Sequence, residues 1–284
     1  MDPVDRVRVR AREGEEDVER EDVLAVEEPL EIRIRSEGGG AAISFVTTMR
    51  TPGNDEELTA GLLFAEGILE KPEDLGALDR PTDPRIDVEL KSNVLIATLS
   101  PEALARAGKL QRGTVMGSAC GVCGKTSIEN VIPKDRPPLF SSATVSPELL
   151  FRLPERLRER QSLFARTGGL HAAGLFSLGG DFLEVREDIG RHNATDKLVG
   201  TFLMRGALPL SERLLMVSGR TGFEIVQKAF AAGIPIVASV SAPSSLAVAL
   251  AETGGVTLIG FLRDRRFNVY ANPQRVARSL GSGT

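Results

Sequence analysis

Residues 214–261 read LLMVSGRTGFEIVQKAFAAGIPIVASVSAPSSLAVALAETGGVTLIGF, and their pattern predicts the fold class of the chain. Short apolar runs of strand length alternate here with segments of helical periodicity. The expected strands cover 214–217, 234–240 and 257–261, and the expected helices cover 223–231 and 246–253. Strands that alternate with helices form a parallel or mixed sheet covered by helices on both faces. An α/β architecture is therefore predicted for the second half of the chain.

The segments on either side of this stretch extend the same architecture. Ser146-Pro147-Glu148 is typical of a helix start, and this helix is expected to run to about Arg166. A hairpin is expected around Gly179-Gly-Asp181, where two apolar runs flank a turn. The remaining expected elements are a helix over 188–204, an edge strand over 267–270 and a final helix over 273–280.

The first half contains more strands than helices. Leu30, Ile32 and Ile34 alternate with charged residues, which predicts a strand with one polar face. Asn54 is a plausible N-cap for the one clear helix of this half. The expected elements are strands over 30–34 and 43–49, that helix over 55–68, and a hairpin over 86–98 that turns at Lys91-Ser-Asn93.

These patterns predict that the chain is divided into three regions. Residues 1–22 mix charges of both signs, which predicts a flexible, solvated arm that is either disordered or a frayed edge strand. Residues 23–138 are expected to form a smaller, mixed α+β domain rich in strands. Residues 139–284 are expected to form the α/β domain, and the boundary rests on the linker-like Pro133-Lys-Asp-Arg-Pro-Pro138. The chain as a whole is therefore α+β in arrangement.

The composition is that of an ordinary globular protein and excludes several classes. The 284 residues are 42% hydrophobic and 26% charged, with a net charge of −4, which argues against a general nucleic-acid binder. The N-terminus has no apolar segment of the kind found in secretory signals, and no run approaches the ~18 apolar residues that span a bilayer. A cytoplasmic protein without a membrane anchor is expected, and thiols stay reduced in that compartment.

The two cysteines of the chain lie three residues apart, in Gly117-Ser-Ala-Cys120-Gly-Val-Cys123-Gly-Lys125-Thr126. The glycines leave the backbone bare, so that another molecule can approach a sulfur atom closely. Lys125 lies nearby and would lower the pKa of a thiol, as would a helix start. A reactive thiolate could then accept sulfane sulfur from a donor persulfide and pass it on.

Other interpretations of this segment stay open at the level of the residues alone. Gly124-Lys125-Thr126 fits a loose P-loop, but the preceding residues make a poor strand. Cys120 and Cys123 could bind zinc together with His171 and His192, although the spacing does not match a zinc finger. A thioredoxin-like redox pair would need a βαβ unit beside it. The plainest alternative is two buried thiols that act as small hydrophobic side chains.

Three loops of the second half point to an anionic ligand. The loops at 218–222 and 241–245 each join an expected strand to an expected helix, and helix N-termini favour phosphate. The third loop follows the last strand of the quoted stretch and carries Arg263, Arg265 and Arg266. Arginine suits bidentate phosphate recognition, and an aromatic side chain such as Phe261 could stack on a base. Ordinary surface arginines at a solvated strand end are an equally good explanation of that loop by itself.

The ordered set of motifs resembles the formate dehydrogenase accessory sulfurtransferases of the FdhD type. The segments that carry the resemblance occur in order over roughly residues 25–276, and only the arm lies outside it. They are 50–58, 120–124, 167–173, 187–197, 218–220, 232–235, 241–243 and 260–270.

The resemblance implies a function, a site and partners. A cysteine desulfurase would donate sulfur to Cys120, which would carry it as a persulfide with Cys123 assisting or sharing it. The acceptor would be the molybdenum cofactor in its bis(molybdopterin guanine dinucleotide) form, bound as cargo and destined for formate dehydrogenase. The implied cofactor-binding residues are Phe261, Leu262, Arg263, Asp264, Arg265 and Arg266. The resemblance also implies that the protein forms a homodimer and that it binds no metal ion directly.

The resemblance also implies a three-layer α/β/α second half similar to cytidine deaminases. Deaminases need zinc ligands and a glutamate that acts as acid and base in an H-x-E motif. The corresponding stretch here is His171-Ala-Ala173, with alanine at the glutamate position, and no P-C-x-x-C follows. Deaminase chemistry is therefore not expected.

Overall fold

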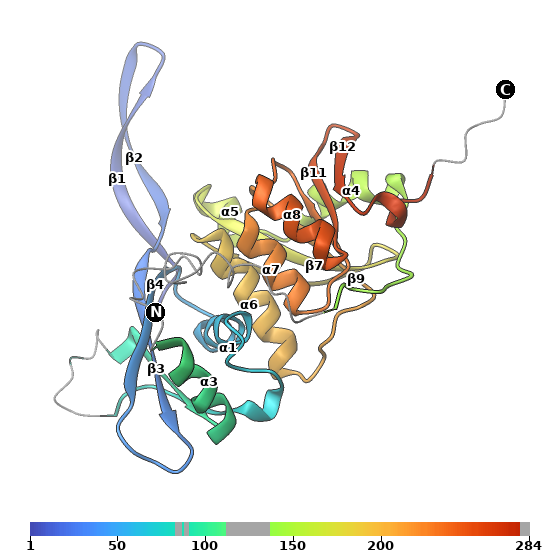
Figure 1. Ribbon diagram of the computed structural model, residues 1–284. Coiled ribbons are helices and arrows are strands. Elements are labelled where there is room, and N and C mark those ends of the chain that lie inside the picture. The colour runs from blue at the N-terminus through green and yellow to red at the C-terminus, as the bar shows by residue number, and fades with distance from the viewer. Residues whose placement is uncertain (83–86, 88–90, 112–136, 279–284) are drawn as a thin grey trace.

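The computed structural model describes residues 1–82, 87, 91–111 and 137–278, and it places a six-stranded sheet at the centre of the second half (Figure 1). The strand order is β12-β11-β10-β9-β7-β8. The strands are β7 (His171–Ser177), β8 (Phe182–Asp188), β9 (Arg213–Val217), β10 (Ile236–Ser239), β11 (Thr257–Arg263) and β12 (Arg266–Ala271). Strands β9, β10 and β11 run parallel, whereas β7 and β12 run antiparallel to their neighbours β9 and β11. The predicted mixed sheet is confirmed.

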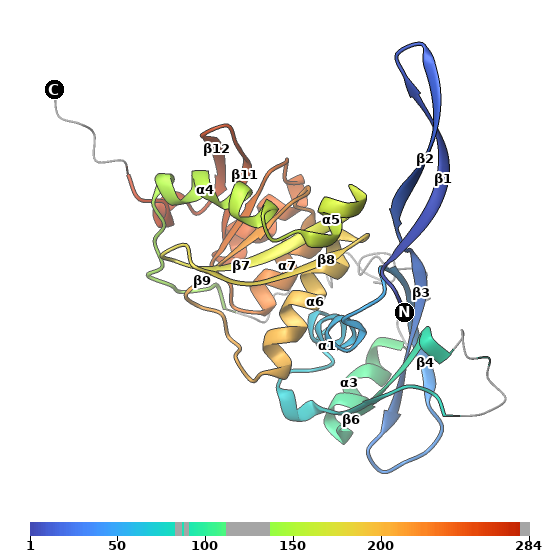
Figure 2. The ribbon, with the colours of Figure 1, turned by 180° about the vertical axis from the view of Figure 1, so that it is seen from behind.

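Helices cover both faces of this sheet, as predicted (Figure 2). On β9, Leu215 and Val217 pack in the cluster of α6, α7 and α8, and Leu214 and Met216 pack in the cluster of α4. This alternation follows from the two-residue period of a strand. The helices are α4 (Pro147–Arg158), α5 (Ser162–Thr167), α6 (Arg191–Met204), α7 (Phe223–Ala231) and α8 (Ser245–Gly254). The three-layer arrangement is confirmed, and its likeness to cytidine deaminases stays a prediction.

A smaller sheet of order β4-β3-β6-β5 forms the first half. Its strands are β3 (Glu28–Ser36), β4 (Ile43–Arg50), β5 (Leu75–Asp79) and β6 (Val94–Leu99), and its helices are α1 (Asp55–Ala65), the short 3-10 helix η1 (Pro72–Asp74) and α3 (Pro101–Gln111). Strand β6 pairs with β3 on one side and β5 on the other. The first strand of the predicted hairpin over 86–98 lies mostly outside the described residues. Asn54 is the N-cap of α1, but its side chain makes no capping hydrogen bond.

Of the two alternatives predicted for residues 1–22, disorder is wrong and a strand is confirmed, although this strand is paired along its length rather than frayed. These residues belong to a hairpin of two ten-residue strands, β1 (Val4–Glu13) and β2 (Glu16–Ala25), which turns at Gly14 with φ +65° and projects from the body (Figure 1). Arginines of β1 stand opposite acids of β2, and ion pairs such as Arg12–Asp17 at 3.0 Å join the strands. The hairpin nonetheless remains solvated, because most of its side chains are exposed.

Two further predictions, both about helices, are wrong. The helix expected over 147–166 is two helices, because the carboxylate of Glu187 accepts hydrogen bonds from the N–H groups of Leu163 and Phe164 and starts α5 there. The helix expected over 273–280 is reduced to the 3-10 helix η3 (Pro273–Arg275). Arg275 is buried there and donates to the carbonyl oxygens of Leu139 and Gly255, which ties the segment to the body of the sheet.

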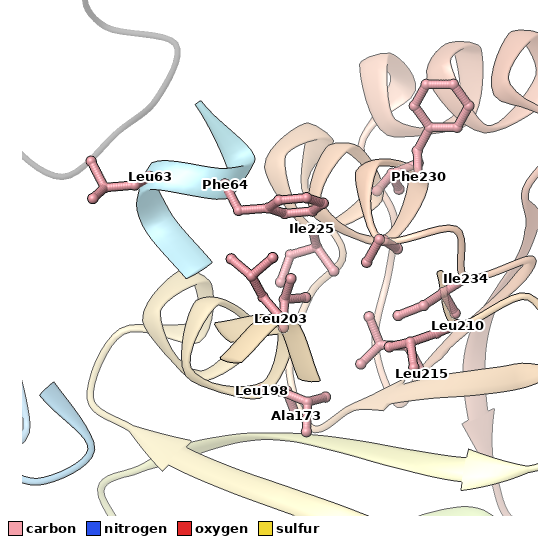
Figure 3. Close-up of a cluster of buried hydrophobic side chains, with 14 of the residues drawn as sticks. Leu63, Phe64, Ala173, Leu198, Leu203, Leu210, Leu215, Ile225, Phe230 and Ile234 are labelled. Carbon is pink, nitrogen blue, oxygen red and sulfur yellow. The ribbon is translucent and has the colours of Figure 1, made fainter. Parts of the chain in front are cut away.

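The two halves share one hydrophobic core. A single cluster of buried side chains runs from Ile34 and Phe45 of the small sheet to Leu215 and Leu258 of the large one. Figure 3 shows Leu63 and Phe64 of α1 in the same cluster as Leu198 of α6. The helices α1 and α6 therefore join the two sheets. In the described part of the chain, none of the helices is long and apolar enough to cross a membrane.

Helices α1 and α6 cross at backbone contact distance. A Cβ atom added to Gly61 would lie 1.9 Å from the carbonyl oxygen of Asp196. A Cβ atom added to Gly200 would lie 1.9 Å from the carbonyl oxygen of Glu57. Because only glycine leaves room for such an approach, these two positions set how closely the halves pack.

Candidate functional site

The loops after β9 and β10 meet at the carboxyl edge of the parallel strands, where β11 also contacts the second loop. The N–H of Thr221 donates to the carbonyl of Ala242 (3.2 Å), and the N–H of Ser244 donates to the carbonyl of Thr221 (3.0 Å). The N–H of Phe261 donates to the carbonyl of Ser241 (3.1 Å). Ligands of open α/β sheets bind at this edge. The structure therefore brings together the loops at 218–222 and 241–245 and places Phe261 of β11 beside the second of them, whereas an anion site at this edge stays a prediction.

The end of β11 and the turn that joins it to β12 contain left-handed backbone positions without glycine. Phe261, Asp264 and Arg265 have φ values of +53°, +51° and +54°, and the pairing of β11 with β12 shifts register between Gly260 and Arg263. Each such residue costs about 1–2 kcal/mol relative to a right-handed conformation. A bulky aromatic residue in this conformation is uncommon, and such positions gather at ligand sites. The turn is therefore the most conformationally constrained part of the candidate site.

The predicted cofactor-binding residues lie in different environments. Phe261 is half-buried, and Arg263, Asp264, Arg265 and Arg266 are exposed. The guanidinium carbon of Arg265 lies 5.1 Å from the centre of the Phe151 ring. Leu262 is fully buried in the core beside α4, so its side chain serves packing and only its backbone borders the turn. The predicted sulfur-carrying residues, Cys120 and Cys123, lie outside the described residues.

The chain's two histidines meet at the loop between β9 and α7. His171 opens β7, where the N–H of Ala172 donates to Ser218 Oγ (2.8 Å) and the N–H of Ser218 donates to the Ala172 carbonyl (3.0 Å). A Cβ atom on Gly219 would lie 3.1 Å from His171 Nδ1. His192 is the second residue of α6, and its Nδ1 lies 3.0 Å from Oε2 of Glu224 at the start of α7. The sequence patterns alone did not predict that either histidine lies beside this loop.

The surroundings of His171 are cationic. Its pKa is lowered by burial first and then by the positive charges of Arg191, His192 and Arg220, against a smaller opposite effect of Asp188. In the part of the chain that the structure describes, no three or more His, Cys, Asp or Glu side chains gather as metal ligands would. The lowered pKa favours the neutral form of the His171 imidazole at this edge of the sheet.

A buried polar network holds this edge against the first half. Asp188 is fully buried and lies 2.7 Å from Lys197 Nζ. Lys197 Nζ donates to the Thr51 carbonyl (2.9 Å), and the Thr51 N–H donates to Asp188 Oδ2 (3.2 Å). Asn193 Nδ2 donates to the Met49 carbonyl (2.7 Å). Two motifs of the sequence, around 50–58 and 187–197, are therefore one structural unit.

Sequence reasoning missed that these residues position the site. Asp188 and Lys197 form a buried ion pair, and breaking such a pair leaves an uncompensated buried charge. The sequence did carry one hint of this role. The helix that contains Lys197 begins with a run of polar residues, whereas its later positions are apolar. Nothing in the sequence alone says that this run faces Thr51.

Comparison with known proteins identifies related chains over nearly the whole length. The family model described as FdhD/NarQ matches residues 25–277. A relative from Streptomyces coelicolor named sulfur carrier protein FdhD is 47% identical over 97% of this chain and 96% of its own. A relative of the same name from Mycobacterium tuberculosis is 45% identical over 95% of this chain and 97% of its own.

A solved structure shares the fold. The crystal structure of a protein from Desulfotalea psychrophila, described as a formate dehydrogenase accessory protein, superposes with a TM-score of 0.72. It covers 97% of this chain and 100% of the other, at 23% identity. At that identity the match concerns the fold, and it includes both the small and the large sheet.

Proposed function

The chain belongs to the FdhD/NarQ family, and from this premise we propose that it carries sulfur on Cys120 to a molybdenum cofactor used by formate dehydrogenase. The observation that supports the proposal most is the near full-length similarity, at 45–47% identity, to relatives named sulfur carrier protein FdhD. The glycine-flanked pair Cys120 and Cys123 supplies the nucleophiles that such a carrier needs.

The first step is transfer of a sulfane sulfur atom without net oxidation. The Cys120 thiolate attacks the terminal sulfur of a persulfide on a cysteine desulfurase, and a new S–S bond forms. The S–S bond of the donor breaks, and the donor cysteine leaves as a thiolate. Cys120 then holds the persulfide. A lowered thiol pKa speeds this step, because the thiolate is the attacking species.

The second step delivers the sulfur as sulfide and needs two electrons. Cys123 can provide them if its thiolate attacks Cys120 Sγ and the terminal sulfur leaves toward the metal of the cargo. A disulfide between the two cysteines remains, and a cellular dithiol must reduce it before the next cycle. We propose this role for Cys123 because it lies three residues from Cys120.

The cargo would be the guanine-dinucleotide form of the molybdenum cofactor, held at the edge described above. Two loop-to-helix junctions, the exposed arginines Arg263, Arg265 and Arg266, and the half-buried Phe261 suit phosphates and a base. We further propose that the protein works as a cytoplasmic homodimer, with a cysteine desulfurase as donor and formate dehydrogenase as recipient.

Mass spectrometry of the protein after incubation with a cysteine desulfurase and cysteine tests the proposal. We expect a reducible gain of about 32 Da, one sulfane sulfur, mapped to Cys120. Cys120→Ala should abolish the gain. Cys123→Ala should keep it but block release of sulfide to an acceptor.

Two results would contradict the sulfur-carrier role. Unmodified thiols together with stoichiometric zinc would identify a metal-stabilised binding module. Unmodified free thiols, with a known acceptor loaded in parallel, would identify a chaperone that binds and delivers the cofactor without sulfur chemistry. In that case Cys120→Ala would still activate formate dehydrogenase.

A further inference from the structure

The two faces of the hairpin β1–β2 differ in their chemistry. Residues that stand directly opposite each other in an antiparallel pair share a face. On one of them, which we call the charged face, the register gathers four arginines of β1 and three acids of β2: Arg6, Arg8, Arg10, Arg12, Asp17, Glu19 and Glu21. Ion pairs join Arg12 to Asp17 at 3.0 Å and Arg6 to Glu21 at 3.7 Å. This face therefore neutralises most of its own charge.

The opposite face, which we call the apolar face, has no packing partner in the described part of the chain. Its apolar residues are Val7, Val9, Ala11, Val18 and Leu24. Val18 and Leu24 are 38% and 45% exposed, and none of the five belongs to a described hydrophobic cluster. Figures 1 and 2 show the hairpin standing clear of the body. A two-stranded ribbon is only marginally stable in water by itself, so this face calls for a surface to pack against.

Acidic residues border the apolar face. Asp5 and Asp22 stand directly opposite apolar residues of this face, and Glu13 and Glu16 close it at the turn. The one basic residue on the face is Arg20, which pairs with Glu13 at 3.1 Å. Asp5 and Asp22 accept hydrogen bonds from the N–H of the next residue, at 2.7 and 2.9 Å, but form no ion pair with a described residue. The apolar face thus carries an uncompensated negative charge.

This charge selects among the surfaces that could cover the face. An acidic face is repelled by nucleic acid and by anionic lipid. The same face of a second copy would bring acids against acids. Pairing of two copies along the free edge of β1 would set rows of arginines side by side, which is also unfavourable. A basic protein surface is the complementary partner.

We propose that the apolar face of the hairpin docks a partner protein whose surface has an apolar centre bordered by lysine or arginine. Protein interfaces combine an apolar core with a polar rim in this way. The rim acids Asp5 and Asp22 supply the charge complementarity that sets specificity and association rate. The hairpin residues 4–24 precede the segment 25–277 that the family model matches, so the docking face is separate from the matched motifs.

The base of the hairpin lies next to the candidate functional edge. The N–H of Val26 donates to the carbonyl of Pro3 at 2.9 Å and closes the base. A Cβ atom added to Gly169 would lie 3.9 Å from the Cβ of Ala25, and Gly169 is two residues before His171 at the start of β7. A protein held on the hairpin is therefore brought to the end of the large sheet where the loops after β9 and β10 meet.

Titration calorimetry of the full chain against purified cysteine desulfurase, and separately against formate dehydrogenase, tests the docking face. The choice of these two proteins rests on the proposed function, whereas the docking face rests on the geometry. The double variant Val7→Ser, Leu24→Ser should bind the partner about tenfold or more weakly, because it removes apolar side chains from the centre of the interface. Val23→Ser is the matched control, since Val23 lies on the charged face opposite Arg6, and it should leave the affinity unchanged.

A second pair of variants tests the rim charge without touching an apolar side chain. Asp22→Asn should weaken binding about twofold to fivefold and should make the affinity less dependent on salt concentration. Glu19→Gln removes the same charge from the charged face of the same strand and should change neither value. This pair keeps the test valid if the serine variant unfolds the hairpin.

Hydrogen exchange reports the contact directly. The backbone amides of residues 4–25 should exchange more slowly in the complex than in the free chain. Binding to neither protein, full affinity in the double serine variant, or an equal loss in Val23→Ser would overturn the inference. A change from dimer to monomer in the double serine variant, measured by sedimentation velocity, would assign the face to a second copy and would also overturn it.

The outcome is separable from the sulfur-carrier proposal. Glutathione persulfide can load Cys120 without a docked protein: the Cys120 thiolate takes the terminal sulfur, and glutathione leaves as a thiolate. The double serine variant should load fully from this small donor. Failure of Cys120 to take up sulfur from it would contradict the carrier role and leave the docking face standing. Unchanged partner binding in the hairpin variants would overturn the docking face and leave persulfide formation standing.

Discussion

At the scale of single residues, Gly61 and Gly200 control how the two halves of the chain fit together. Their Cα atoms face the carbonyl oxygens of Asp196 and Glu57, in each case with no room for a methyl group. The partners are backbone atoms of regular helices and cannot rotate away as a side chain can. A substitution here must therefore move α1 relative to α6.

We predict that Gly61→Ala and Gly200→Ala each lower the free energy of unfolding by about 1–3 kcal/mol or more. Denaturant unfolding followed by circular dichroism measures this change. Gly108→Ala in α3 is the control, because an added Cβ meets no atom within 4 Å there. It should be neutral or stabilising by up to about 1 kcal/mol, as alanine favours a helix. Equal effects at all three positions would refute the close-contact argument.

The residues of the candidate site were only partly predictable. The loops at 218–222 and 241–245 were found from sequence, because a strand, a short loop and a helix follow one another there. The meeting of His171 with Arg191 and Arg220 was not, since these residues come from three separate elements. Periodicity predicts elements, but side chains from β7, α6 and the β9–α7 loop converge only through the sheet order.

At the scale of elements, helices and strands were predicted best from the sequence where several local signals, such as periodicity and flanking glycines, agree. Helix α7 has the predicted bounds, since Gly222 precedes an apolar periodic run and Gly233, with φ +75°, follows it. The helix expected over 147–166 was wrong because Glu187, distant in sequence, starts α5. The hairpin β1–β2 was missed although Val7, Val9 and Ala11 alternate with arginines, because charged residues dominate its composition.

The hairpin β1–β2 is predicted to contribute little to the stability of the rest. None of its residues belongs to the described hydrophobic clusters, and its ion pairs are exposed and worth little. A chain that lacks residues 2–25 should fold and melt within about 2–4 °C of the full chain, as expected for a change near 1 kcal/mol. Thermal melting followed by circular dichroism checks this. A truncated chain that cannot fold would show that the hairpin is part of the folding unit.

At the scale of the whole molecule, the shared core makes the two halves one cooperative unit. The same cluster contains Ile34 and Leu63 from the first half and Leu198 and Leu258 from the second. The network of Thr51, Asp188 and Lys197 adds buried polar contacts across the same boundary. Neither half can separate without exposing this surface and the buried charges.

We therefore predict a single unfolding transition for the chain. Scanning calorimetry should give equal calorimetric and van't Hoff enthalpies, because a common core couples the two sheets. Circular dichroism and the histidine NMR signals should report the same midpoint. Two resolved transitions would contradict this coupling and would favour independent domains over 23–138 and 139–284.

The length of the hairpin also governs the shape of the molecule in solution. Each strand has ten residues, which corresponds to a reach of about 33 Å at the usual rise per residue. A compact chain of 284 residues has a radius of gyration of about 19 Å, so the hairpin extends well beyond the body. The protein must therefore experience more hydrodynamic drag, and rotate more slowly, than a sphere of equal mass.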